Sequence, residues 1–131
     1  MSTISIIDRV KSYEDACAIA GITPITLEQF SFLPEDQQKA MFGLHKITTV
    51  INTLNGGWKP DWNNSNEWKY YPWFLMRDQA GETPGSGFSS YGCDYDCTCS
   101  TVGSRLCLDT SEKAEYVAEI MLQEYKDFMK K

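Results

Sequence analysis

Residues 58–74 read WKPDWNNSNEWKYYPWF, and the rest of the chain is organised around this stretch. It holds all four tryptophans together with Tyr70, Tyr71 and Phe74. Seven of the seventeen aromatic residues therefore lie in seventeen consecutive positions, where an aromatic content of 13% predicts about two. A helical pattern ends just before it at Asn55-Gly56-Gly57, and a Gly-, Ser- and Cys-rich region follows it. We expect the sheet of the protein to begin here.

The second half of the stretch has the composition of a β-strand, because residues 67–76 (EWKYYPWFLM) favour extended backbone throughout. Strand alternation divides its side chains between two faces. One face carries Trp68, Tyr70, Phe74 and Met76, and the other carries Lys69, Tyr71, Trp73 and Leu75. One face can pack on helices, whereas the other is too apolar to be left bare without consequence. Pro72 cannot donate to a ladder, so the strand should lie at an edge or be bulged there.

Helices are predicted before the stretch. Ser12 reads as an N-cap for a helix that Gly21 ends, and Thr26 with Gln29 forms a capping box for a short turn over residues 27–32. Pro34 fits the first position of a longer helix that Asn55-Gly56-Gly57 ends. The apolar stripe of that helix is Ala40, Leu44, Ile47, Ile51 and Leu54. Residues 1–10 are expected to be an edge strand or an ordered tail.

Two more strands and one helix are predicted after the stretch. Residues 85–91 can start the second strand, and residues 104–108 (SRLCL) read as the third. Asp109-Thr110-Ser111 then caps a final amphipathic helix. Its stripe consists of Ala114, Val117, Ala118, Met121, Leu122, Tyr125, Phe128 and Met129.

This order of helices, strands and a helix lacks βαβ alternation and therefore predicts an α+β fold. We expect a small antiparallel β-meander of about three strands, packed against the N-terminal helices and the C-terminal amphipathic helix. The sequence shows no repeat and no domain boundary, so residues 1–131 should form a single α+β domain.

Composition narrows the function classes. The net charge of −6 disfavours sequence-independent binding to nucleic acid. No apolar run approaches the roughly 20 residues that span a bilayer, so no membrane contact is expected. Residues 1–10 lack a basic region followed by an apolar one, which argues against a secretory signal. The expected location is cytoplasmic, in which reduced thiols are the normal state.

Four cysteines are clustered as C-x3-C-x-C-x7-C, at Cys93, Cys97, Cys99 and Cys107. Structural zinc sites usually present C-x2-C or C-x4-C knuckles, and this spacing is irregular. Free thiols on a hairpin, a disulfide and a metal site all remain open, with free thiols favoured. Accordingly no metal and no cofactor is expected. Cys17 reads as a small core residue.

The sequence assembles no nucleophile, base and orienting group, so the protein is not expected to be an enzyme. His45, the only histidine, lies beside an apolar stripe and reads as a solvated or hydrogen-bonded helix residue. Gly85-Ser86-Gly87 lacks the remainder of a phosphate-binding loop. Arg105 can pair with Asp94, with Asp96 or with an anionic ligand.

The aromatic stretch itself has two interpretations. In the first, the tryptophans are core residues that anchor helices to a small sheet. In the second, they form a binding face, because Trp and Tyr dominate interaction hot spots and also stack on bases. The candidate face consists of Trp58, Trp62, Trp68, Tyr71 and Trp73. One side of the strand can serve each purpose.

Several blocks together resemble a family of small uncharacterised proteins from gut Bacteroidetes genomes and from their phages and prophages. The matching positions are residues 57–74, 86–88 (SGF), 102–107 (VGSRLC) and 114–116 (AEY). The resemblance spans most of residues 40–130 and implies a phage-related or mobile-element context, without a defined activity. Cys93, Cys97 and Cys99 are not part of the pattern, which further weakens the zinc interpretation.

The function expected from these observations is that of a non-enzymatic, phage-related accessory or particle-associated protein. It would act through protein–protein contacts on the aromatic face, in the bacterial or infected cell or in the virion. One alternative is a single-stranded nucleic-acid binder that uses the same aromatics. The other is a small metal-binding protein or enzyme that uses the cysteine cluster. The sequence does not define the oligomeric state.

Overall fold

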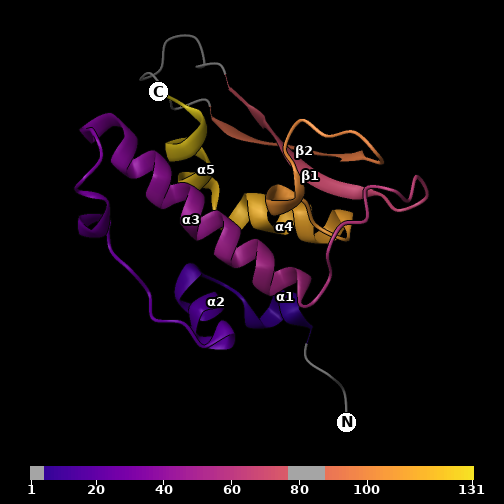
Figure 1. The fold of residues 1–131 in the computed structure, drawn as a ribbon, viewed down its shortest axis with the longest axis horizontal. Helices are drawn as coiled ribbons and strands as arrows, with labels where there is room; N and C mark the ends of the chain where they lie inside the picture. Colours follow the sequence, from indigo (N-terminus) through magenta and orange to yellow (C-terminus); the bar gives the residue numbers. More distant parts are fainter. Residues whose placement is uncertain (1–4, 77–87) are drawn as a thin grey trace.

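A computed structural model describes residues 5–76 and 88–131, and it confirms the α+β fold. The long helix α3 runs through the middle of the molecule (Figure 1), with α1 and α2 on one side of it and the C-terminal helices and the sheet on the other. The elements in chain order are α1 Ile6–Arg9, α2 Tyr13–Ala20, the 3-10 turn η1 Leu27–Phe30, α3 Glu35–Asn55, β1 Lys69–Leu75, β2 Ser89–Asp96, the 3-10 turn η2 Ser104–Leu106, α4 Ser111–Ile120 and α5 Leu122–Met129.

Local capping signals place most helix ends where the sequence predicts them. Ser12 Oγ accepts a hydrogen bond from Asp15 N at 3.1 Å, and Gly21 ends α2 in the left-handed region at φ +72°. Thr110 Oγ1 caps α4 by accepting from Lys113 N at 3.1 Å. Two boundaries differ. Pro34 is the N-cap of α3 rather than its first residue, and residues 6–9 form a helical turn rather than a strand.

The sheet is smaller than a full meander. β1 and β2 pair antiparallel, and the third segment contributes one bridging pair, in which Tyr70 and Leu108 exchange backbone hydrogen bonds at 2.9 and 2.7 Å. The predicted third strand over residues 104–108 is therefore wrong except at Leu108, because residues 104–106 turn as η2. Cys107 and Leu108 are both fully buried. Of the predicted second strand, residues 85–87 lie outside the described residues.

Pro72 and the irregularity of the sheet are close but not coincident. The register shifts between Trp73 and Phe74, which pair with Gly92 and Ser90, so Tyr91 is the extra residue of a bulge. Pro72 follows Tyr70 by two residues in β1, so the backbone nitrogens of both residues point to the same side of the strand. The N–H of Tyr70 points away from β2, toward Leu108. The missing N–H of Pro72 therefore faces the outer edge and does not interrupt the β1–β2 ladder.

One hydrophobic cluster joins the elements on both sides of α3. From α3 it takes Ile47, Val50, Ile51 and Leu54, whereas Ala40 and Leu44 of the predicted stripe are only partly buried. The N-terminal segment adds Val10, Tyr13, Ala16 and Cys17, and the C-terminal helices add Ala114, Val117, Met121 and Tyr125. This placement of Cys17 confirms it as a core residue.

The predicted C-terminal helix is broken at Met121, which has φ −114° and ψ 26°. The break allows α5 to lie along α3, where the two backbones approach each other at Gly43. A Cβ atom at position 43 would stand 2.8 Å from the carbonyl oxygen of Glu124 in α5. The glycine inside α3, which lowers helix propensity by roughly 1 kcal/mol relative to alanine, is thus required by this crossing.

Candidate functional site

The first two tryptophans of the aromatic stretch have structural roles in the loop that precedes β1. Trp58 Nε1 donates to Glu67 Oε2 at 3.3 Å, and the backbone N–H of Asp61 donates to Glu67 Oε1 at 2.7 Å. Trp62 Nε1 donates to Ser104 Oγ at 2.7 Å. Both indoles are partly buried. These contacts fold residues 58–67 around the Glu67 carboxylate and tie them to η2.

Lys69 lies at the centre of this loop, a role that no pattern in the sequence predicted. Its side chain is fully buried, and Nζ donates to the carbonyl oxygens of Asn64 at 3.0 Å and Cys97 at 2.6 Å. Glu67 Oε1 lies 3.5 Å from Nζ and supplies the opposite charge. The Trp62 ring centroid is 5.3 Å from the same ammonium, in cation–π range. The alternation of side chains along the strand assigned Lys69 to one face. It could not show that the segments of Asn64 and Cys97 close over the side chain.

Trp68 forms an exposed aromatic cluster with residues of the neighbouring strand. Its ring stacks on that of Tyr95 with centroids 4.4 Å apart and planes 12° apart, and both rings contact Tyr70 edge-on at 6.3 and 6.2 Å. Trp68 remains 48% exposed and Tyr95 45% exposed. We call Trp68, Tyr70 and Tyr95 the aromatic platform. Tyr95 was not among the predicted site residues, and only its cross-strand pairing with Tyr70 reveals it.

Trp73 and Tyr71 lie on the opposite face of β1. Trp73 is 49% exposed, whereas Tyr71 is partly buried, and burial raises the pKa of its hydroxyl. Tyr71 lines a hollow of about 310 Å³ between the outer edge of β1 and α5, which Tyr125 also lines. The five predicted aromatic residues therefore do not form one face. Two of them support the loop, Trp68 belongs to the platform, and two lie across the strand.

Arg105 follows Ser104 in η2, next to the contact of Trp62 with Ser104. It forms no ion pair and no hydrogen bond with the residues that the structure describes, so the expected pairing with Asp94 or Asp96 is not seen. Instead it lines a hollow of about 450 Å³ formed with η1 and α3. His45 lines the same hollow, and its Nε2 is hydrogen-bonded to the Tyr13 hydroxyl at 2.9 Å.

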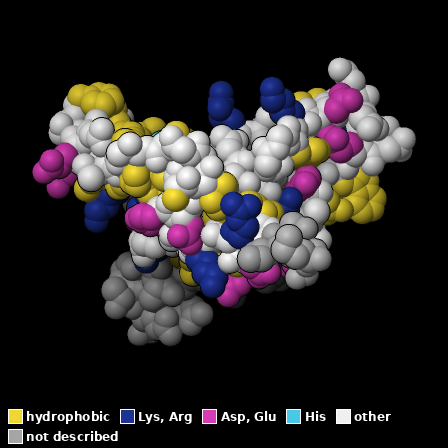
Figure 2. Space-filling view, turned by 90° about the horizontal axis from the view of Figure 1, so that it is seen from below, with side chains coloured by type: hydrophobic (Ala, Val, Ile, Leu, Met, Phe, Trp, Pro, Cys, Tyr) yellow, Lys and Arg dark blue, Asp and Glu magenta, His cyan; other side chains and the backbone are white. Residues whose placement is uncertain are grey.

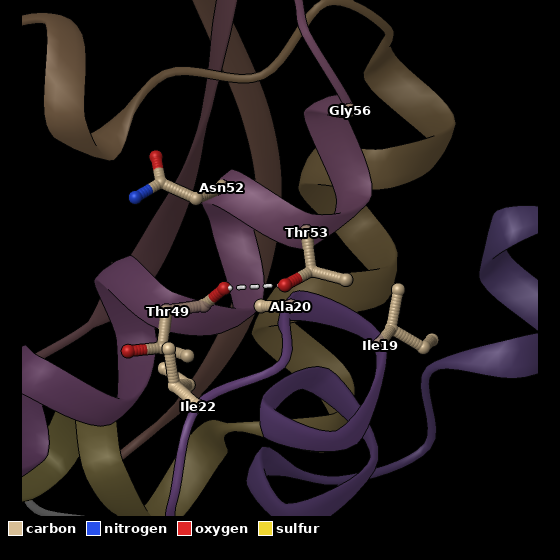
Figure 3. A pocket seen from close by; sticks show the side chains of 7 residues that line it. All are labelled: Ile19, Ala20, Ile22, Thr49, Asn52, Thr53 and Gly56. Carbon is tan, nitrogen blue, oxygen red and sulfur yellow. Dashed lines mark hydrogen bonds between the residues drawn. The ribbon is translucent and has the colours of Figure 1, made fainter.

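A third hollow, of about 410 Å³, lies between the end of α2 and the C-terminal half of α3 (Figure 3). Thr53 Oγ1 donates to the Thr49 carbonyl at 2.9 Å, and Thr49 Oγ1 donates to the His45 carbonyl at 2.8 Å. Both hydroxyl protons are thus committed to the backbone of α3. Asn52 projects away from Ile19, so the amide does not complete a polar site there.

All five cysteines are free thiols, as the favoured interpretation expected. Burial raises the pKa of Cys107 to about 12, with Asp96 adding to the rise, whereas Cys99 is exposed. Across residues 5–76 and 88–131, no group of three His, Cys, Asp or Glu side chains is placed to hold a metal ion. The cluster therefore holds one buried thiol, Cys107, and one exposed thiol, Cys99.

Exposed hydrophobic side chains gather at the two ends of the long axis of the molecule (Figure 2). One end is the η1 region, where Phe32 is 79% exposed, and the other is the β1–β2 hairpin with the platform. Charged side chains lie between these ends and also next to both of them (Figure 2). In the part of the chain that the structure covers, no helix is both long and apolar enough to cross a membrane.

No protein-family model, curated protein or solved structure matches this chain.

Proposed function

We propose that this chain is a non-enzymatic accessory protein that binds another protein through the aromatic platform. The observation that carries this proposal is the stacked Trp68–Tyr95 pair, in which each ring leaves nearly half of its residue surface open to solvent. Large aromatic rings supply most of the binding energy in protein interfaces when they become desolvated. A phage-related setting, in the infected cell or in the particle, is part of the proposal and rests only on the resemblance carried by residues 57–74, 86–88, 102–107 and 114–116.

The platform is also rigid before it binds. Tyr95 is a paired residue of β2, and Trp68 directly precedes Lys69, the first paired residue of β1. The two rings stack, so each restricts the side-chain rotation of the other. Binding therefore orders few side chains, each of which would otherwise cost about 0.5–1.5 kcal/mol. A preorganised aromatic surface suits a protein partner with aliphatic or aromatic groups of its own.

Charge favours a partner that carries basic residues. Lys69, the basic residue next to Trp68, is fully buried, and Asp94 and Asp96 pair with Tyr71 and Lys69 on the face opposite the platform. The net charge of the whole chain is −6. Electrostatic attraction of this kind increases the association rate and weakens as salt is added.

The test compares Trp68 and Trp73, which are almost equally exposed but lie on opposite faces of β1. Tagged wild-type protein is used to capture partners from host lysate, and the captured protein is purified and titrated calorimetrically. Trp68→Ala should weaken its binding by about 2 kcal/mol, or roughly 30-fold. Trp73→Ala, the matched control, should change the dissociation constant by less than about threefold. Urea unfolding of both variants verifies that each is folded.

Equal losses at Trp68 and Trp73, or no loss at Trp68, would refute the platform as the docking surface. The single-stranded nucleic-acid alternative predicts something different. A labelled oligonucleotide would bind wild-type protein with a strong salt dependence, and Trp68→Ala would abolish that binding. Such a result would replace the protein-binding proposal.

A further inference from the structure

The hollow that Arg105 lines lies between the η1 region, α3 and η2, and the proposed function does not use it. Three segments that are distant in sequence form it: the residues around η1, one side of α3, and η2. Its volume of about 450 Å³ lies within the range of about 300–1,000 Å³ that is usual for small-molecule sites. We refer to it as the Arg105 hollow.

The walls of the Arg105 hollow are apolar and partly bare. They consist of Phe30, Phe32 and Leu33 from the η1 region and Met41 and Leu44 from α3. Phe30 is held in place by Phe42, whose ring centroid is 5.5 Å away. Phe32, in contrast, is 79% exposed and has no ring contact among the described residues. Burying such a side chain is favourable, so an apolar ligand that covers Phe32 would gain binding free energy here.

Among the described residues, Arg105 is the only Lys or Arg whose side chain lines the hollow. It has no carboxylate partner among the described residues. Lys46, the nearest basic residue along α3, is engaged elsewhere, since its Nζ is 3.2 Å from Glu124 Oε2. An unpaired guanidinium at the border of an apolar hollow matches a carboxylate, to which it can donate two parallel hydrogen bonds.

His45 provides a second donor on the same wall. The Tyr13 hydroxyl accepts from the Ile25 N–H at 3.1 Å, which leaves its own proton to be donated to His45 Nε2 at 2.9 Å. In the tautomer that accepts this bond, the ring proton of His45 is on Nδ1, which has no partner among the described residues. Thr48 also lines the hollow, but its hydroxyl donates to the His45 carbonyl at 3.0 Å.

We propose that the Arg105 hollow binds a small amphipathic carboxylate. The apolar body of the ligand would cover Phe32 and contact Met41 and Leu44, and its carboxylate would accept hydrogen bonds from Arg105, with His45 Nδ1–H as a further donor. A neutral molecule of the same shape would bind more weakly, because it leaves the guanidinium unpaired. A cationic one would be repelled.

The experiment uses decanoate as the probe and isothermal titration calorimetry of the full chain as the measurement. Decanoate should bind saturably at concentrations below about 1 mM, and 1-decanol should bind at least about tenfold more weakly. Decyltrimethylammonium should not bind in this range. Nitrogen–proton correlation spectra should show the largest decanoate-induced shifts at the amides of residues 30–33, 41 and 44–48.

Four variants separate the proposal from nonspecific adsorption. Arg105→Gln should weaken decanoate binding about tenfold or more, Arg105→Lys should recover part of the loss, and Phe32→Ala should weaken decanoate and 1-decanol alike. Lys39→Gln is the matched control, because it removes one charge from an exposed position of α3 that does not line the hollow. No saturable binding, equal affinity for decanoate and 1-decanol, or unchanged affinity in Arg105→Gln would each overturn the proposal. Both Arg105 and Phe32 are exposed, so these variants should fold.

Discussion

Lys69→Met gives the sharpest test of how the aromatic stretch is held together. Methionine resembles lysine in length but carries neither charge nor donors. The substitution removes the hydrogen bonds to the carbonyl oxygens of Asn64 and Cys97 and the ion pair with Glu67. Because Lys69 is fully buried and methionine carries no donor, the substituted side chain cannot replace these bonds.

The magnitude follows from these contacts. An unpartnered buried acceptor costs about 1–3 kcal/mol, and removal of one member of a buried ion pair typically costs about 3–5 kcal/mol in all. The lower half of that range is expected, since Glu67 is 25% exposed at its side chain and keeps the N–H donors of Asp61 and Trp58. With a urea m value of about 2 kcal/mol/M, a loss of about 3 kcal/mol lowers the midpoint by about 1.5 M.

Equilibrium urea unfolding, followed by tryptophan fluorescence and by far-UV circular dichroism, measures this loss. Lys59→Met is the matched control, because Lys59 is an exposed lysine of the same stretch, and its change should remain within about 0.5 kcal/mol. If Lys69→Met is as stable as Lys59→Met, the Lys69 contacts do not stabilise the loop and our account of the stretch is incorrect.

Three further predictions concern other parts of the fold. Gly43→Ala should lower the free energy of unfolding by about 1–2 kcal/mol in urea titrations despite its better helix propensity, because the new Cβ meets the Glu124 carbonyl oxygen at 2.8 Å; a stabilised variant would contradict the close crossing of α3 and α5. Burial, followed by the charge of Lys46, lowers the pKa of His45. As the pH falls below about 6.5, the unfolded chain therefore binds more protons than the folded chain. The contribution of His45 to stability should accordingly be present above that pH and lost below it. Urea unfolding at pH 7.5 and pH 5.5 should accordingly show a smaller pH effect in His45→Gln than in wild type, and an equal effect would contradict the prediction. Iodoacetamide should modify the exposed Cys99 in the native protein but reach Cys107 only after unfolding, as read by peptide mass spectrometry, and native labelling of Cys107 would be inconsistent with its burial.

Much of the secondary structure could be predicted because its signals are local. A side-chain oxygen at Ser12 or Thr110 satisfies an N–H three residues away, and Gly21 supplies a positive φ without steric strain. Helical periodicity in α3 and in the C-terminal helices identified most of the residues that enter the core. Each of these signals involves neighbours within one turn of the chain.

The secondary-structure predictions that were wrong have a common cause, because contacts with residues distant in sequence override the local preference. The apolar positions in residues 104–108 read as a strand, but η2 is tied to the aromatic loop through Ser104, and only Leu108 reaches β1. The C-terminal stripe reads as one helix, but α5 follows α3 beyond Met121. Residues 6–9 are too short for local propensity to determine their state.

For the candidate site, sequence patterns alone were enough to identify the aromatic stretch and to select Trp68 and Arg105 as candidate residues. Local capping and periodicity also predicted the α+β class. Only the tertiary structure separated the five aromatic residues into loop supports, a platform and an opposite face. It also paired Trp68 with Tyr95 and brought Arg105 beside His45 and Phe32. The reason is physical: capping and periodicity act between residues within a turn or two, whereas the burial of Lys69, the stacking across strands and the Arg105 hollow arise only where segments far apart in the chain meet.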